Sequence, residues 1–253
     1  MNSPVASPRP ASLRPAHLLD EAPLEYRLAM DLAMSGLTST GRAGAGVLIV
    51  ASVPAFIDEA LLCADGPLTI AVETTDLADI VGVRAGLLIR PGRPMPAIMA
   101  ADALAQRRGT PSAVSYGCAL WVSPQRCSWR RRAKALASRL TPGAMLTMVT
   151  AGPLGQVVSR FRRTPLGSSH PAWLGAGRGR VLSRAGLQPE RVLALGGFSS
   201  IAWALAARLA GLAERLDLAD RAEAGYRRSL LAPHTGDPAL VNVLTFRRGG
   251  SLC

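Results

Sequence analysis

The chain has 253 residues, of which 49% are apolar and 18% are charged, and its formal net charge is +12. This composition excludes an intrinsically disordered chain, and the length is that of one domain with a small appendage. The longest apolar run, 192–207, is shorter than the roughly 20 residues of a membrane-spanning helix. We see no secretory signal and therefore expect a cytoplasmic protein.

The four cysteines and three histidines form no recognisable ligand or nucleophile pattern. No two cysteines are spaced C-x-x-C, and no histidine stands beside a cysteine at ligand spacing. We therefore predict no metal site, and the sequence identifies no catalytic residue.

The first 41 residues predict a flexible arm followed by a helix. The arm is rich in proline and serine, and apolar residues recur at helical spacing over 18–37. We expect residues 42–253 to form one Rossmann-like α/β domain.

Short apolar runs alternate with helical patterns through this domain. The alternation predicts right-handed βαβ units and a mostly parallel sheet flanked by helices. The predicted strands are 47–51, 68–73, 86–92, 97–103, 112–122, 144–150 and 239–248. Helices are expected over 56–64, 130–140 and 201–231, and the run 181–197 predicts a helix, a glycine turn and a strand.

The first predicted strand runs into a loop of the kind that holds cofactors. In such strand–turn–helix units backbone N–H groups face the cofactor, and glycine is favoured because it leaves room and adopts positive φ. Here the loop reads Ala51-Ser52-Val53-Pro54-Ala55 and contains no glycine. An acidic residue at the end of the next strand can bind a ribose, and another acid one strand later can accept a hydrogen bond from an adenine amino group.

Over roughly 42–248 the chain resembles the class I S-adenosylmethionine-dependent methyltransferases. VLIVASVPAF stands where the family has its glycine-rich motif, and LTPGAMLTMV is similar to the family's fifth-strand turn. Glu73, which closes TIAVE, matches the ribose-binding acid, and Asp102 in MAADAL matches the acid next to adenine. The resemblance implies S-adenosylmethionine as the cofactor, with these contacts: Ala51, Ser52, Val53, Glu73, Asp102 and Ala103.

The motif departs from the family pattern at several positions. Ile49 replaces the usual acid, while Ala51, Val53 and Ala55 replace three glycines. Val53 matters most because β-branched residues resist positive φ and occupy space. The acid of the fourth strand is also missing. No N/D-P-P-Y signature of base-modifying methyltransferases occurs, which argues against nucleic acid as a substrate or partner.

The positive charge is concentrated in one part of the chain. No acidic residue occurs between Asp102 and Glu190, and that interval holds fourteen basic residues. A block of one sign predicts an anionic partner, which could be an acidic protein, an anionic membrane surface, a phosphate backbone or an anionic small molecule. The arginines could equally solvate helix faces. The basic residues are Arg107, Arg108, Arg126, Arg130, Arg131, Arg132, Lys134, Arg139, Arg160, Arg162, Arg163, Arg178, Arg180 and Arg184.

Three hypotheses for function follow from these observations. The first is a non-catalytic module that keeps a methyltransferase-like fold with a degenerate S-adenosylmethionine site and binds a partner through its basic surface. The second is an active methyltransferase acting on a small molecule, since methyl transfer can depend largely on positioning. The third is a peripheral membrane-associated protein that uses the apolar stretch 196–216. The oligomeric state is left open by the sequence.

Overall fold

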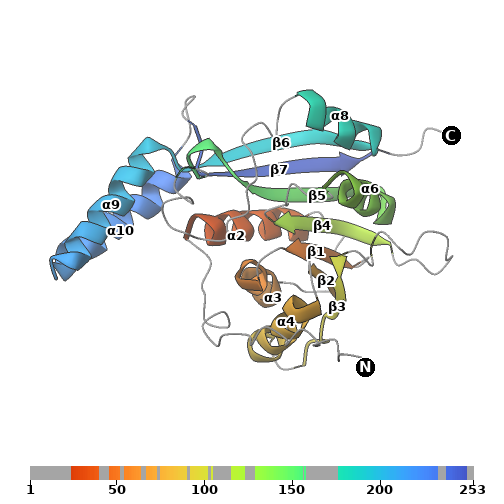
Figure 1. Cartoon of the computed structure of the whole chain (residues 1–253), viewed down its shortest axis with the longest axis horizontal. Coiled ribbons are helices and arrows are strands. Elements are labelled where there is room, and N and C mark those ends of the chain that lie inside the picture. Colours follow the sequence, from red (N-terminus) through yellow and green to blue (C-terminus); the bar gives the residue numbers. More distant parts are fainter. Residues whose placement is uncertain are drawn as a thin grey trace, which may run out of the picture.

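The computed structural model forms one seven-stranded sheet with helices on both of its faces (Figure 1). It describes residues 24–39, 46–51, 54–63, 67–72, 75–89, 92–101, 104, 115–122, 129–155, 157, 176–232 and 238–249. The predicted arm, with the first part of the helix expected from residue 18, lies outside these residues. The Rossmann-like α/β class expected from the sequence is confirmed.

The strand order is β3-β2-β1-β4-β5-β7-β6. The strands are β1 (Val47–Ala51), β2 (Leu68–Val72), β3 (Ala97–Ala100), β4 (Tyr116–Val122), β5 (Leu140–Ala151), β6 (Leu187–Leu195) and β7 (Val241–Arg248). Neighbouring strands from β3 to β5 pair in parallel, whereas β7 is antiparallel to both β5 and β6. The sheet is therefore mostly parallel, with β7 inserted in the opposite direction.

Strand β1 explains why the sheet needs helices on both faces. All five of its residues are buried, and they alternate between two separate apolar clusters. Val47, Ile49 and Ala51 belong to one cluster, while Leu48 and Val50 belong to the other. A continuous apolar run of this length is typical of a parallel strand covered on both sides.

The helices divide between the two faces. The described helices are α2 (Leu24–Ser39), α3 (Asp58–Cys63), α4 (Thr75–Leu88), α6 (Trp129–Arg139), α8 (Ala176–Arg184), α9 (Phe198–Leu212) and α10 (Leu216–Leu231), with a 3-10 turn η2 (Pro54–Ile57) before α3. Helices α2, α3 and α4 pack on the face that holds Ile49, and α6 and α8 pack on the face that holds Leu48. Among the residues that the structure describes, no helix is long and apolar enough to cross a membrane.

Two predictions of secondary structure are wrong: one predicted strand is helical, and one predicted helix is a pair of helices. The run 86–92 was expected to be a strand, but residues 75–88 form helix α4. Its apolar residues recur every three or four positions, so the helical period outweighs the short β-like run. The segment 201–231 was expected to be one helix, but it forms a hairpin of α9 and α10.

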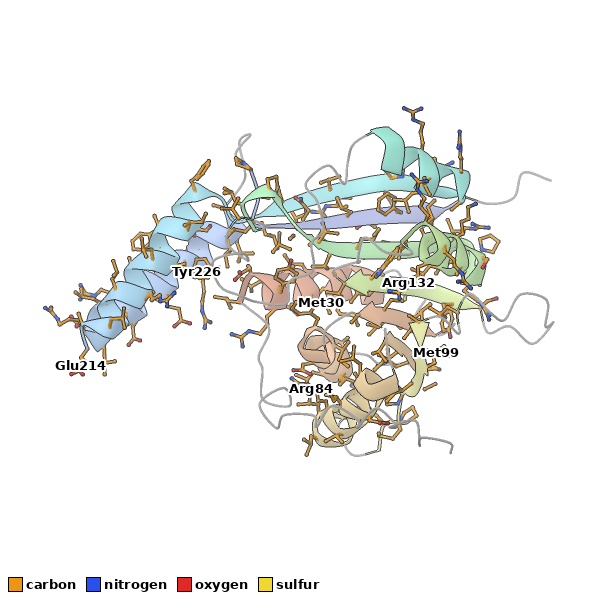
Figure 2. The ribbon with its side chains drawn as sticks, viewed as in Figure 1. Met30, Arg84, Met99, Arg132, Glu214 and Tyr226 are labelled. Atoms are coloured by element: carbon orange, nitrogen blue, oxygen red, sulfur yellow. The ribbon has the colours of Figure 1, made fainter. Side chains whose placement is uncertain are left out.

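The α9–α10 hairpin joins β6 to β7 and projects away from the sheet (Figure 1). The two helices pack along each other, and Glu214 lies at the far end of the hairpin (Figure 2). Glu214 has a φ of 54°, a conformation that non-glycine residues rarely adopt, and this reverses the chain without a glycine or proline at the turn itself. At the near end, Ser229 is hydrogen-bonded to Ser200 at 2.9 Å.

Candidate functional site

The carboxyl ends of four parallel strands lie at one level of the sheet. Ala51 pairs with Val72 on one side and with Val122 on the other, and Val72 pairs with Ala100. The strand order reverses between β1 and β4, and ligands of open α/β sheets bind at such a switch point, beyond the carboxyl ends of the strands. This edge is therefore the candidate site.

The segment after β1 is packed into the core. Ala51 is only 1% exposed, and Phe56 and Ile57 of η2 are also buried. The Phe56 ring stacks on Tyr26 of α2, with centroids 4.8 Å apart and planes 9° from parallel. Only two residues separate Ala51 from η2, so the loop is short and runs directly into this packed turn.

A partly buried ion pair fixes the start of α3 beyond this turn. The Arg84 Nε of α4 donates a hydrogen bond of 2.8 Å to Asp58, and a second guanidinium nitrogen contacts the other carboxylate oxygen. Figure 2 labels Arg84 in this region of the molecule. Two parallel bonds from one guanidinium hold a carboxylate in a defined orientation. The chain that follows the loop is therefore held from two sides, by Tyr26 and by Arg84.

The start of α2 brings polar groups to the same region. The Tyr226 hydroxyl of α10 donates a hydrogen bond of 2.7 Å to the buried Glu25 carboxylate, which joins residues 201 positions apart. The neighbouring Tyr26 hydroxyl is buried and has no hydrogen-bond partner among the described residues. Burial, with the Glu25 charge, raises the pKa of Tyr26 far above its usual value, so this hydroxyl stays protonated.

Of the cofactor contacts implied by the resemblance, the structure describes Ala51 alone. Ala51 lies at the carboxyl end of β1, at the switch point. Glu73 directly follows the last residue of β2 in the sequence, and Asp102 comes two residues after the last residue of β3. Ser52, Val53, Glu73, Asp102 and Ala103 themselves lie outside the described residues.

The described residues at the ends of these strands supply no polar side chain for S-adenosylmethionine. The family motif has glycine where Ala51 stands, and the Ala51 side chain is packed in the core cluster with Ile49 and Phe56. The described ends of β1, β2 and β4 are apolar and buried, and they offer side chains without a proton donor or acceptor.

The sequence did not predict the hydrogen bond between Tyr226 and Glu25, which connects α10 to the start of α2. Glu25 looked like an ordinary acidic residue in the first turn of a helix, and Tyr226 lay in what was expected to be one long helix. No local pattern links residues so distant in sequence. A helical-wheel comparison would have placed Tyr226 on the apolar face of α10, with Ala222 and Leu230.

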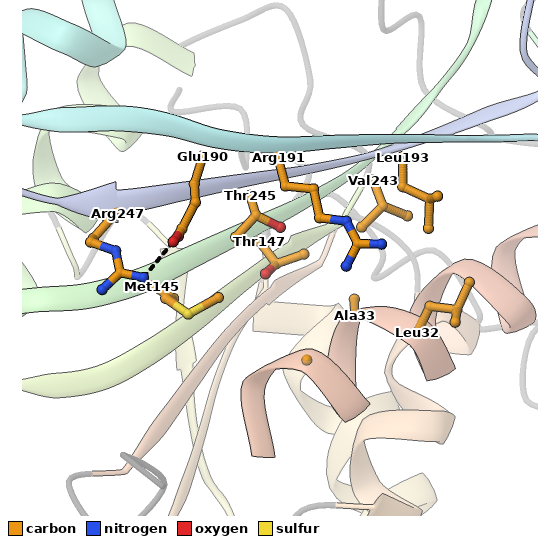
Figure 3. A pocket seen from close by; sticks show the side chains of 11 residues that line it. Leu32, Ala33, Met145, Thr147, Glu190, Arg191, Leu193, Val243, Thr245 and Arg247 are labelled. Atoms are coloured by element: carbon orange, nitrogen blue, oxygen red, sulfur yellow. Dashed lines mark hydrogen bonds and ion pairs between the residues drawn. The ribbon is translucent and has the colours of Figure 1, made fainter. Parts of the chain in front are cut away.

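A pocket of about 430 Å³ lies elsewhere, on the sheet face beside α2 (Figure 3). Its floor comes from β5, β6 and β7, and Leu32, Ala33 and Gly36 of α2 line one wall. Arg247 forms an ion pair with Glu190 across its rim. The pocket is formed by mid-strand residues such as Thr147, so it does not coincide with the carboxyl edge.

The described part of the arginine-rich block lies mainly on α6 and α8. Helices α6 and α8 contact each other on the sheet face opposite α2. Their exposed basic side chains are Arg130, Arg131, Lys134, Arg180 and Arg184. Neither helix contains an acidic residue.

Within the described residues, no group of three or more His, Cys, Asp or Glu side chains could hold a metal ion. Cys118 of β4 is a free thiol and is buried. Burial raises the pKa of the Cys118 thiol to about 11, so the thiol is protonated at neutral pH.

The fold is that of the class I S-adenosylmethionine-dependent methyltransferases, as the resemblance implied. Magnesium protoporphyrin IX methyltransferase (ChlM) from Synechocystis PCC 6803, solved with bound SAH, matches with a TM-score of 0.55 and 13% identity, over 92% of this chain and 92% of that one. The N-methyltransferase NodS from Bradyrhizobium japonicum WM9, solved in complex with S-adenosyl-L-homocysteine, matches with a TM-score of 0.52 and 11% identity, over 93% and 96%.

A sarcosine dimethylglycine methyltransferase structure from Galdieria sulphuraria gives a similar result. Its TM-score is 0.54 at 10% identity, over 88% of this chain and 86% of that one. No protein-family model and no curated protein sequence matches the chain. At these identities the likeness establishes the fold, and the activity is a separate question.

Proposed function

We propose that this methyltransferase-like protein is a non-catalytic binding module that presents a basic face to an acidic protein. The observation that carries the proposal is the glycine-free end of β1. A cofactor loop needs positive φ and close approach of the backbone, and here Ala51 is buried in the core and Val53 follows two residues later.

The surroundings of this loop support the proposal. Phe56 stacks on Tyr26, and Asp58 is held by Arg84, so the turn is packed as part of the core. Any movement of η2 or of the start of α3 to make room for a ligand would have to break these contacts. The acids missing from the first and fourth strands point the same way, since Ile49 and the run 114–116 stand in their places.

Calorimetric titration with S-adenosylhomocysteine tests the cofactor half of the proposal. We expect no binding heat from the folded wild-type protein at ligand concentrations up to about 1 mM, which corresponds to less than about 4 kcal/mol of binding free energy. Binding in the micromolar range would overturn the proposal and favour the alternative, an active methyltransferase on a small molecule.

Restoring the glycines sharpens the same experiment. The triple variant Ala51→Gly, Val53→Gly, Ala55→Gly recreates the glycine pattern while leaving Glu73 and Asp102 unchanged. We expect it to bind S-adenosylhomocysteine measurably better than wild type, with circular dichroism as the control for folding. Equal micromolar affinity of the two proteins would contradict the idea that the filled loop abolishes binding.

The basic face is the proposed partner surface. Arg130, Arg131 and Lys134 are exposed on α6, in a stretch without acidic residues, so an acidic protein would meet a field of one sign. The probe is immobilised poly-L-glutamate. We expect salt to release the wild-type protein, because exposed charge pairs are screened.

Charge reversal locates the contact on the molecule. The variant Arg130→Glu, Arg131→Glu, Lys134→Glu should leave the resin at clearly lower salt than wild type. A matched control, Arg208→Glu, Arg215→Glu, Arg221→Glu, makes the same change of net charge on exposed residues of the hairpin. If both triple variants shift the elution equally, net charge alone explains the binding, and the proposed surface is wrong.

A further inference from the structure

Helix α9 carries an apolar stripe on the side that faces solvent. Its residues follow one another at spacings of four, three, four and three, which places them along one line of the helix surface. The four large side chains are exposed by 57% at Phe198, 55% at Leu205, 56% at Leu209 and 75% at Leu212, and the exposed Ala202 fills the remaining place. We call these five residues the α9 stripe.

The opposite side of α9 already has its packing partner. Ile201 and Ala204 rest against the core, and the helix runs along α10. The Trp203 ring lies against Gly225, where a side-chain carbon would come within 2.6 Å of it. A helix that is apolar all round is normally buried on all sides, and α9 is covered by the described residues on one side only.

The charges of the hairpin are separated from the stripe. Helix α9 contains one charged residue, Arg208, and no acid. The other charged side chains of the hairpin belong to α10 and to the turn before it, such as Asp217, Glu223 and Arg228. Helix α9 is thus the apolar helix of the hairpin and α10 the charged one, although α10 also exposes Leu216 by 73% and Leu231 by 57%.

We infer that α9 docks flat on an anionic lipid surface, with the stripe in the headgroup–acyl boundary and α10 toward water. An interfacial helix needs an apolar face of Phe and Leu, a polar opposite side, and cations rather than acids at the boundary. The stripe supplies the apolar face and Arg208 the cation, while the charged side chains of α10 supply the polar side of the hairpin. The net charge of +12 attracts the chain to anionic lipid. The projection of the hairpin from the sheet leaves this side accessible (Figure 1).

A second copy of the chain is the competing occupant, and size and charge count against it. A helix of 15 residues is about 22 Å long and about 10 Å wide, and this footprint is small beside the roughly 800 Å² that each partner buries in a stable interface. Two chains of this net charge also repel each other. Neither objection applies to an anionic membrane.

Vesicle flotation of the full-length protein tests the inference. We expect wild type to float with vesicles of phosphatidylcholine containing about one third phosphatidylglycerol, and to float less with phosphatidylcholine alone. The variant Leu205→Glu, Leu209→Glu should partition at least about tenfold more weakly, because two leucines lose their burial in lipid. Both positions are exposed, so thermal unfolding should match wild type.

A matched variant separates the stripe from exposed apolar residues in general. Val83→Glu, Leu87→Glu introduces the same charge at two exposed positions of α4 and should float like wild type. The inference is overturned if wild type fails to float with either vesicle, or if the stripe variant floats as well as wild type. A wild-type dimer that the stripe variant converts to a monomer, measured by light scattering, would instead identify the stripe as a protein interface.

Discussion

Strand β1 and helix α9 are both almost entirely apolar, yet the fold uses them differently. All five residues of β1 are buried, because helices cover both faces of the sheet. Helix α9 is covered on one side, and its other side exposes large apolar side chains. The apolar character of β1 is explained by folding alone, whereas that of the α9 stripe is not. Surplus apolar surface of this kind points to a partner outside the chain.

The largest loss of stability is expected at Gly152, which directly follows β5 and has no room for a side chain. The Gly152 amide donates a 2.7 Å hydrogen bond to Leu240, and a side-chain carbon on Gly152 would come within 2.2 Å of the Ala239 carbonyl oxygen. Gly152→Ala should lower the free energy of unfolding by about 3 kcal/mol or more, because backbone must move. Urea denaturation measures this. The control Gly86→Ala has open space around it and should stabilise by up to about 1 kcal/mol.

The next largest loss of stability is expected from the hydrogen bond that joins the α9–α10 hairpin to α2. Tyr226→Phe removes the 2.7 Å bond to the buried Glu25 carboxylate. We expect a loss of about 1.5 to 3 kcal/mol in the free energy of unfolding, the range for hydrogen bonds to charged groups. The exposed pair Arg227–Glu223 has the same bond length, but Arg227→Ala should cost less than about 1 kcal/mol. Equal losses in urea denaturation would contradict the role of burial.

Alkaline pH should weaken the sheet through Cys118. Burial raises the pKa of this thiol from 9.0 to about 11 in the folded chain. Above pH 9 the unfolded state loses this proton while the folded state retains it, so stability falls between about pH 9 and 11. The loss amounts to about 2 kcal/mol at pH 10.5, and Cys118→Ala should remove it. Thermal unfolding at pH 8 and pH 10.5 checks this; an identical decline in both proteins would refute the assignment.

The smallest change in the free energy of unfolding is expected at Gly225, in the α9–α10 hairpin. Gly225→Ala would press on the Trp203 ring, but that ring is 44% exposed and can shift toward solvent. The gain in helix propensity, about 1 kcal/mol, offsets this repacking, so the free energy of unfolding should change by less than about 1 kcal/mol. Comparison with Gly152→Ala in the same denaturation series tests whether the hairpin is more permissive than the sheet. A loss as large as that of Gly152→Ala would show that it is not.

Local patterns in the sequence by themselves determined those elements whose flanking residues favour the same structure. The apolar run 47–51 is a buried strand with the bounds expected, and the basic segment 130–140 is helix α6 but for its last residue, which begins β5. The mostly parallel sheet also follows from the alternation of strands and helices. The resemblance led to the methyltransferase fold, which the solved structures confirm. The cofactor contacts, Ala51 included, stay predictions.

Tertiary structure decided the features that depend on distant segments. Strand β7 lies antiparallel between β5 and β6, an order that no local period encodes. The division of 201–231 into two helices depends on the packing of α9 along α10. The turn between them has a positive φ at Glu214, a conformation that is unfavourable for a residue other than glycine. The contact of Tyr226 with Glu25 and the exposure of the α9 stripe are likewise set by packing. Periodicity shows that a face is apolar, but only the arrangement of the whole chain decides whether that face is covered.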